Sequence, residues 1–120
     1  MFGYSAGKFT TNSLFGRVSS DFSLDDVRCV GTERSIADCE HTTKENCGAA
    51  EGAGVQCFQE RMLTKLFLFL PPLTLSHAGF ELLGGSGPHE GNLFVNRKPV
   101  CDDHFTEEAH GPMNAYVVCR

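Results

Sequence analysis

The stretch Asp21–Cys57, DFSLDDVRCVGTERSIADCEHTTKENCGAAEGAGVQC, is the most informative part of this 120-residue chain. Its 37 residues hold four of the six cysteines and no apolar run long enough to form a core alone. Cysteines at this density are typical of small, loop-rich domains that are stapled by disulfides in an oxidising compartment. The stretch therefore predicts an exported, disulfide-stapled domain.

Composition narrows the classes of protein further. A chain of this length forms at most one domain. It can bury only a modest core, so disulfides would contribute considerably to its stability. The net charge of −5 argues against nucleic-acid binding, which requires a basic patch. The six cysteines include no Cys-x-x-Cys pair, which argues against a zinc ribbon or a thioredoxin-like motif. Six cysteines allow fifteen disulfide connectivities, and their spacing does not choose among them.

Both ends of the chain carry motifs of one family. The motifs LDDVRCVGTE, SIADCEH, NC and EGAGVQC, all within residues 24–57, resemble the second half of a scavenger receptor cysteine-rich (SRCR) domain. The motifs LLGGSGPHEGNLFV, PVCDDHF and NAYVVCR, within residues 82–120, resemble the opening half of such a domain. The resemblance covers nearly all of the chain except about residues 58–78.

The two halves stand in the reverse of the family order. Residues 1–57 resemble the C-terminal half, residues 58–78 form an apolar linker, and residues 79–120 resemble the N-terminal half. Joining VVCR at the end to MFGYSAG at the beginning would restore continuous family sequence. The chain is either one circularly permuted domain or the back half of one domain joined to the front half of the next in a tandem array.

The resemblance implies a fold and a disulfide pairing. We expect a small α+β domain in which a curved antiparallel sheet cradles one main helix. The six-cysteine subgroup of the family implies the pairs Cys29–Cys39, Cys47–Cys101 and Cys57–Cys119. Two of these pairs would join the halves, which favours one complete, circularly permuted domain.

Local patterns predict several elements. We expect a strand from Phe22 to Cys29 and one helical turn from Ser35 to Glu40, with Ser35 as its N-cap. Thr106-Glu107-Glu108 indicates a helix start with acids in its first turn, which Gly111-Pro112 breaks, so the main helix is predicted to begin near Asn114. If this helix continues from Arg120 into residues 1–4, the chain break removes hydrogen bonds and frays both ends.

Residues 62–79, MLTKLFLFLPPLTLSHAG, are foreign to the family. A lysine is followed by an apolar run and then by small residues at the −3 and −1 positions, Ser76 and Ala78, before Gly79. This order is typical of a secretory signal peptide. The run is too short to span a membrane and is interrupted by Pro71-Pro72, so we expect no membrane insertion. The alternatives are a relic signal sequence and a linker that packs on the domain.

The acidic residues are candidates for a weak calcium site, because calcium binds hard oxygen ligands. Resemblance to the metal-dependent members implies one site made of Asp102, Asp103 and Glu51. It implies a neighbouring second site made of Asp25, Asp26 and Asn46. Gly52 stands where the family commonly has Asp, which removes one carboxylate. These acids alternatively cap turns or are simply solvated.

The resemblance implies recognition of extracellular protein or polyanionic ligands, including glycoprotein and microbial surfaces. Arg28 and Arg34 are candidates for direct contacts with anions. Motifs for phosphate binding, serine hydrolysis and zinc proteolysis are absent, so we expect no enzyme activity. We expect the domain to be secreted or to be the extracellular part of a membrane protein, with other SRCR domains in tandem as possible neighbours. The alternatives are a noncatalytic scaffold module of a larger secreted enzyme and a rearranged, nonfunctional fragment.

Overall fold

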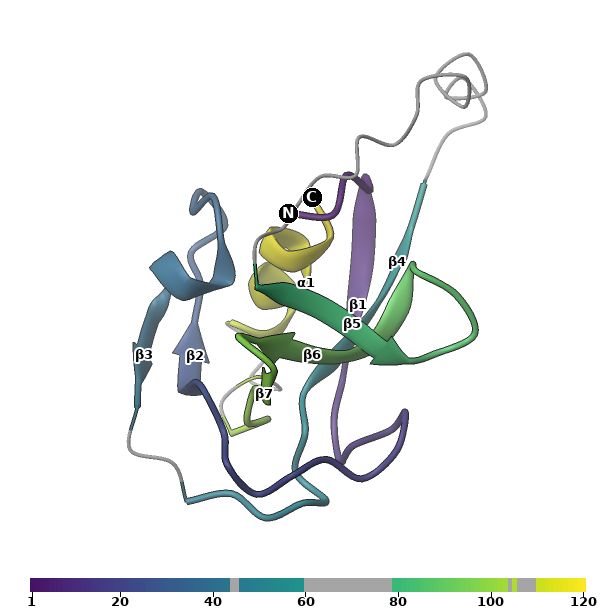
Figure 1. Cartoon of the computed structure of the whole chain (residues 1–120). Helices are drawn as coiled ribbons and strands as arrows, with labels where there is room; N and C mark the ends of the chain where they lie inside the picture. Colours follow the sequence, from purple (N-terminus) through teal and green to yellow (C-terminus); the bar gives the residue numbers. More distant parts are fainter. Residues whose placement is uncertain (44–45, 60–78, 104, 106–109) are drawn as a thin grey trace.

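A computed structural model describes residues 1–43, 46–59, 79–103, 105 and 110–120 (Figure 1). Its larger sheet is antiparallel and follows the order β1-β4-β6-β5, with β7 added beside β6. These strands are β1 (Ala6–Thr10), β4 (Gly54–Phe58), β5 (Phe80–Gly84), β6 (Glu90–Val95) and β7 (Lys98–Pro99). The pairing of β4 with β6 joins the first part of the chain to the last part within one sheet.

A smaller sheet pairs β2 (Asp25–Arg28) with β3 (Glu40–Thr42), and the 3-10 helix η1 (Ile36–Asp38) lies between them in sequence. The side chain of Ser35 accepts a hydrogen bond from the backbone N–H of Ala37, as an N-cap does. The capped turn is therefore confirmed at its start, although it ends at Asp38, and the predicted strand is present but shorter, from Asp25 to Arg28.

The helix α1 (Gly111–Cys119) lies between the two sheets in Figure 1 and packs against β1, β4 and β2. One side of it is completely buried, and the core around it is built from small and medium apolar side chains. The fully buried residues include Val27, Ile36, Val55, Leu93, Val100, Phe105, Ala115, Val117 and Val118. With antiparallel sheets, three disulfides and α1 as the α-helix of the described residues, the structure confirms the predicted α+β fold class.

The disulfides join Cys29 to Cys39, Cys47 to Cys101 and Cys57 to Cys119, the pairs that the resemblance implies. The Cys57–Cys119 bridge ties β4 to the end of α1. A side chain at Gly7 on β1 would collide with the sulfur of Cys119, so this close approach requires glycine.

The start of α1 differs from the prediction. The helix begins at Gly111 and contains Pro112 in its first turn, whereas we predicted that Gly111-Pro112 breaks a helix. Proline is tolerated there because backbone N–H groups in the first turn have no partner within the helix. The predicted helix start at residues 106–108 and the signal-like residues 62–78 lie outside the described residues. Among the described residues, no helix is long and apolar enough to cross a membrane.

The first residues of the chain continue the hydrogen-bonding pattern of α1. The amino group of Met1 donates to the carbonyl of Val117 (3.2 Å), and the N–H of Phe2 donates to the carbonyl of Val118 (3.1 Å). If Met1 is counted as the residue after Arg120, both bonds have the i→i−4 spacing of an α-helix. The two chain ends lie side by side, as Figure 1 shows.

The next two residues cap this extended helix. The N–H of Gly3 donates to the carbonyl of Arg120 (2.9 Å), and the N–H of Tyr4 donates to that of Cys119 (2.7 Å). On the same count these are the two bonds of a Schellman motif, with Gly3 in the left-handed conformation (φ 86°) that this cap needs. The prediction that the break removes these bonds and frays both ends was therefore wrong, because tertiary packing holds the ends together.

The buried position of Met1 gives the fold a pH dependence. Burial and the neighbouring charge of Arg120 lower the pKa of the Met1 amino group from 8.0 to about 6. The unfolded chain therefore binds this proton more tightly, so stability falls as the pH drops from about 8 to about 6. Because the group is partly exposed, we expect a loss on the order of 1 kcal/mol after solvent screening.

This pH dependence is measured by urea unfolding of the free protein and of an N-terminally acetylated protein at several pH values. The acetylated chain keeps an N–H donor for Val117 but has no titrating amine. The difference in stability between the two proteins should change between pH 8 and 6, while the histidine contributions cancel. A pH-independent difference would contradict the assignment.

Candidate functional site

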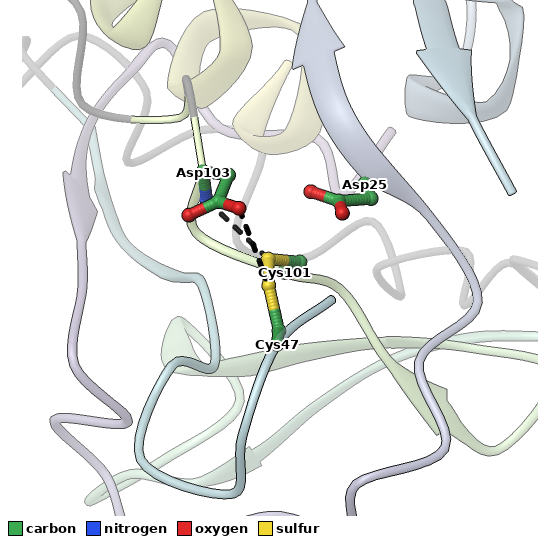
Figure 2. Close-up of side chains that lie close together, drawn as sticks. All are labelled: Asp25, Cys47, Cys101 and Asp103. Carbon is green, nitrogen blue, oxygen red and sulfur yellow. Dashed lines mark hydrogen bonds between the residues drawn. A yellow bond between two sulfur atoms is a disulfide. The ribbon is translucent and has the colours of Figure 1, made fainter. Parts of the chain in front are cut away.

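Two carboxylates from distant parts of the chain converge beside the Cys47–Cys101 disulfide (Figure 2). Asp25 begins β2 and is 1% exposed, whereas Asp103 follows the buried Cys101 and is partly exposed. One ligand atom from each of these four residues lies within 4.8 Å of the others. Because the sulfurs are bonded to each other, only the carboxylate oxygens remain as hard ligands for a cation.

The disulfide positions Asp103. One carboxylate oxygen of Asp103 lies 3.6 Å from the sulfur of Cys47, and its backbone nitrogen lies 3.5 Å from the sulfur of Cys101. The backbone of Cys101 is fixed in turn by a bond from its N–H to the carbonyl of Leu24, which directly precedes Asp25. A covalent bridge and a backbone bond thus bring together two acids that are 78 positions apart in the sequence.

Asn46 completes this group. With its amide nitrogen turned inward, it donates to one oxygen of Asp103 (2.9 Å) and to one oxygen of Asp25 (3.1 Å). With its amide oxygen turned inward, it would add a third oxygen ligand between the two acids. The side chain therefore suits both a cation-free state and a cation-bound state.

The electrostatics of Asp25 favour a positive charge nearby. Burial raises the pKa of Asp25, and the charges of Asp26 and Asp103 raise it further, against hydrogen bonds from the backbone N–H groups of Asp26 and Asn46 that lower it. The Asp26 N–H lies 2.7 Å from the Asp25 carboxylate. A bound cation would relieve both the repulsion and the cost of burying the charge.

Asp102 and Glu51 form a neighbouring pair. The N–H of Asp102 donates to the backbone carbonyl of Glu51 (2.9 Å), and burial, followed by the charges of Asp103 and Glu51, raises the pKa of Asp102. The carboxylate of Asp102 accepts from the N–H of Asn12 (2.8 Å), and that of Glu51 accepts from the N–H of Gly48 (2.8 Å). Glu51 therefore caps its own turn, whereas Asp102 binds the backbone of the distant loop after β1.

The structure groups the candidate residues differently from the sequence analysis. Asp103 lies against Asp25 and Asn46, whereas the resemblance places it with Asp102 and Glu51. The charge of Asp103 nevertheless raises the pKa of both Asp25 and Asp102, so the two groups of acids influence each other electrostatically. Gly52 stands where the family commonly has Asp. A Cβ atom at this position would lie 2.9 Å from the hydroxyl oxygen of Ser13, so the surroundings of Gly52 are tightly packed.

The sequence analysis did not identify Asn12 and Ser13, two residues that lie beside the acidic side chains. Asn12 has a positive φ (55°) and donates to Asp102, and the Ser13 hydroxyl donates to the carbonyl of Ala49 (2.8 Å). Both lie in the loop after β1, which carries no motif, so only the folded chain places them here.

The two candidate arginines are less closely associated with a site. Arg28 pairs with Glu40 of β3 across the smaller sheet (3.5 Å). Arg34 is exposed in the loop before η1. A role for either in anion binding remains a prediction.

The fold and its three disulfides define a small, disulfide-stapled α+β domain of the kind common in exported proteins. Residues 1–58 match the sequence model of the scavenger receptor cysteine-rich domain. These residues belong to the SRCR family, whose domains are extracellular, noncatalytic modules.

Two relatives illustrate the range of this similarity. A scavenger receptor cysteine-rich domain superfamily protein of Patiria pectinifera is 43% identical over 61 residues, or 49% of this chain and 5% of the relative. Lysyl oxidase homolog 2 of Rattus norvegicus is 30% identical over 128 aligned residues, or 96% of this chain and 14% of the relative. The chain thus spans only a small part of each relative. No solved structure matches the chain.

Proposed function

We propose that this domain is an extracellular ligand-recognition module whose binding surface is organised around a weakly bound calcium ion. The observation that carries this proposal is the convergence of Asp25, Asp103 and Asn46 beside a disulfide, with Asp102 and Glu51 next to them. The raised pKa of the buried Asp25 supports it, because unneutralised acids at this position are costly.

The donor chemistry fits calcium. Calcium takes six to eight oxygen ligands, and this cluster offers carboxylate oxygens and an amide oxygen without any free thiolate. Asp25, Asp103 and Asn46 would hold the ion, which would supply positive charge and open coordination positions. Sulfates or carboxylates of polyanionic, glycoprotein or microbial ligands would complete the coordination. Few protein ligands imply an affinity of about 10⁻⁴–10⁻³ M.

A second candidate function is a noncatalytic scaffold module of a larger secreted enzyme. The observation that favours it is the alignment with lysyl oxidase homolog 2, which includes 96% of this chain but 14% of that relative. In such a protein the domain would position or present a catalytic domain encoded elsewhere in the chain.

The calcium proposal predicts the effect of Asp103→Asn, which removes a charge but keeps the shape of the side chain. At about 10 mM calcium, a site with a Kd near 1 mM stabilises the wild-type domain by about 1.4 kcal/mol, and the variant should lose this gain. Urea unfolding with and without calcium measures it. The control is Asp38→Asn, an exposed acid in η1, which should keep the full calcium response.

Ligand binding is tested with heparin as the polyanionic probe. We expect wild-type binding to weaken at least tenfold in EDTA, and Asp103→Asn to bind equally weakly with and without calcium. Wild-type binding that is unchanged in EDTA would overturn the role of calcium.

A further inference from the structure

We propose that segments 1–58 and 79–120 are complementary binding surfaces, and that a second copy of this chain can supply the partner segment by exchanging halves with the first. The proposal concerns assembly and does not depend on the calcium site. It follows from how the two segments contact each other and from how little of the chain connects them.

The two segments share one core rather than packing as separate units. In the larger sheet, Gly54, Val55 and Gln56 of β4 pair with residues 90–92 of β6. Two of the three disulfides, Cys47–Cys101 and Cys57–Cys119, run between the segments. Each segment alone would therefore expose an unpaired sheet edge and apolar core surface, which are strong drivers of association.

The helix makes the match between the segments specific. Segment 79–120 supplies α1, and segment 1–58 supplies the last helical hydrogen bonds and the Gly3 cap. Buried Asn114 of α1 also bonds the backbone of β2, accepting from Cys29 and donating to Val27. These directional contacts select a complementary segment over an arbitrary apolar surface.

None of the contacts described above uses the connection between Phe58 and Phe80. The same bonds can therefore form between segments of different chains. The connection has 21 residues, counting 59–79, and spans up to about 70 Å when extended, so it does not prevent a segment from reaching a second molecule. What decides between the closed and exchanged forms is the effective concentration of one segment at the other within a single chain, compared with the concentration of chains in solution.

The comparison with lysyl oxidase homolog 2 provides independent support. A single alignment covers 96% of this chain, so a relative carries similar sequence through both segments in the same order. If the two segments of that longer chain are also complementary, each would find its complement in a neighbouring part of the same protein. Exchange between two copies is the same recognition with the partner segment on another chain.

The test is oxidative refolding of an equal mixture of unlabelled and ¹⁵N-labelled full-length chains, followed by peptide mass spectrometry without reduction. Exchange predicts Cys57–Cys119 and Cys47–Cys101 peptide pairs in which one peptide is labelled and the other is not. Their fraction should rise at least tenfold between about 10 µM and about 500 µM chain, toward one half in fully exchanged material.

The Cys29–Cys39 bridge is an internal control, because both cysteines lie in segment 1–58. Its peptide pairs should remain fully labelled or fully unlabelled, and mixed labelling there would reveal disulfide scrambling and count against the proposal. Absence of mixed pairs at every concentration, with all three bridges formed, would overturn it.

A second test uses two variants that can form the Cys57–Cys119 bridge only with each other, so its result does not depend on the fraction of exchanged wild-type chains. Cys57→Ser and Cys119→Ser chains each lack one partner of the same bridge, so neither forms it alone. Refolded together, they should form a covalent heterodimer through the remaining Cys57 and Cys119. A mixture that contains no such bridge would contradict exchange.

Discussion

Replacing Cys57 and Cys119 together with alanine should lower the free energy of unfolding by about 4 kcal/mol. The bridge closes a loop of 62 positions, and the loss of its constraint on the unfolded chain accounts for this magnitude. Both cysteines are buried, and the bridge anchors the end of α1 to β4. Because small domains have only about 5–15 kcal/mol of stability, this variant loses a large part of it.

Urea unfolding followed by far-UV circular dichroism measures this loss. The matched comparison is the double alanine variant of Cys29 and Cys39, whose bridge closes only 10 positions and should cost about 3 kcal/mol. A smaller loss for the Cys57–Cys119 variant than for the Cys29–Cys39 variant would contradict the view that the long bridge holds the two segments together.

Asn114→Leu should destabilise the domain by about 2–6 kcal/mol. Asn114 is completely buried in α1, where its oxygen accepts from the N–H of Cys29 (2.8 Å) and its nitrogen donates to the carbonyl of Val27 (3.0 Å). Leucine has a similar size but leaves both backbone groups buried without a partner, and each such group costs about 1–3 kcal/mol.

The control for this variant is Gln59→Leu, which replaces an exposed amide that donates one surface bond to Gly3. We expect a change of less than about 0.5 kcal/mol there. Hydrogen exchange adds a local readout, since the Cys29 amide should lose protection selectively in Asn114→Leu. Equal stability of the two variants would show that Asn114 does not hold β2 to the helix.

Much of the fold could be predicted because its signals are local or are carried by the motifs that resemble the family. The capped turn at Ser35 depends on one side chain and a backbone group two residues away. The disulfide pairs follow from the resemblance, whereas the spacing of six cysteines leaves fifteen possibilities. The start of α1 was mispredicted because Pro112 was interpreted as a helix breaker, although proline suits a first turn.

The candidate site was predictable in its residues but not in its grouping. The acids at positions 25, 102 and 103 stand in motifs, yet motifs do not show which carboxylate turns toward which. Asp103 faces Asp25 because the Cys47–Cys101 bridge and the bond from Cys101 to Leu24 fix its backbone there. Asn12 reaches Asp102 from a loop without any recognisable pattern.

The sequence by itself therefore determined the class of domain, its dependence on disulfides, and the residue types available for a cation. Only the tertiary structure decided that residues 1–4 complete and cap a helix that begins at Gly111. The physical reason is that a helical hydrogen bond needs its donor and acceptor in the right place, whether or not the chain between them is continuous. Packing of the two segments into one core supplies that placement here.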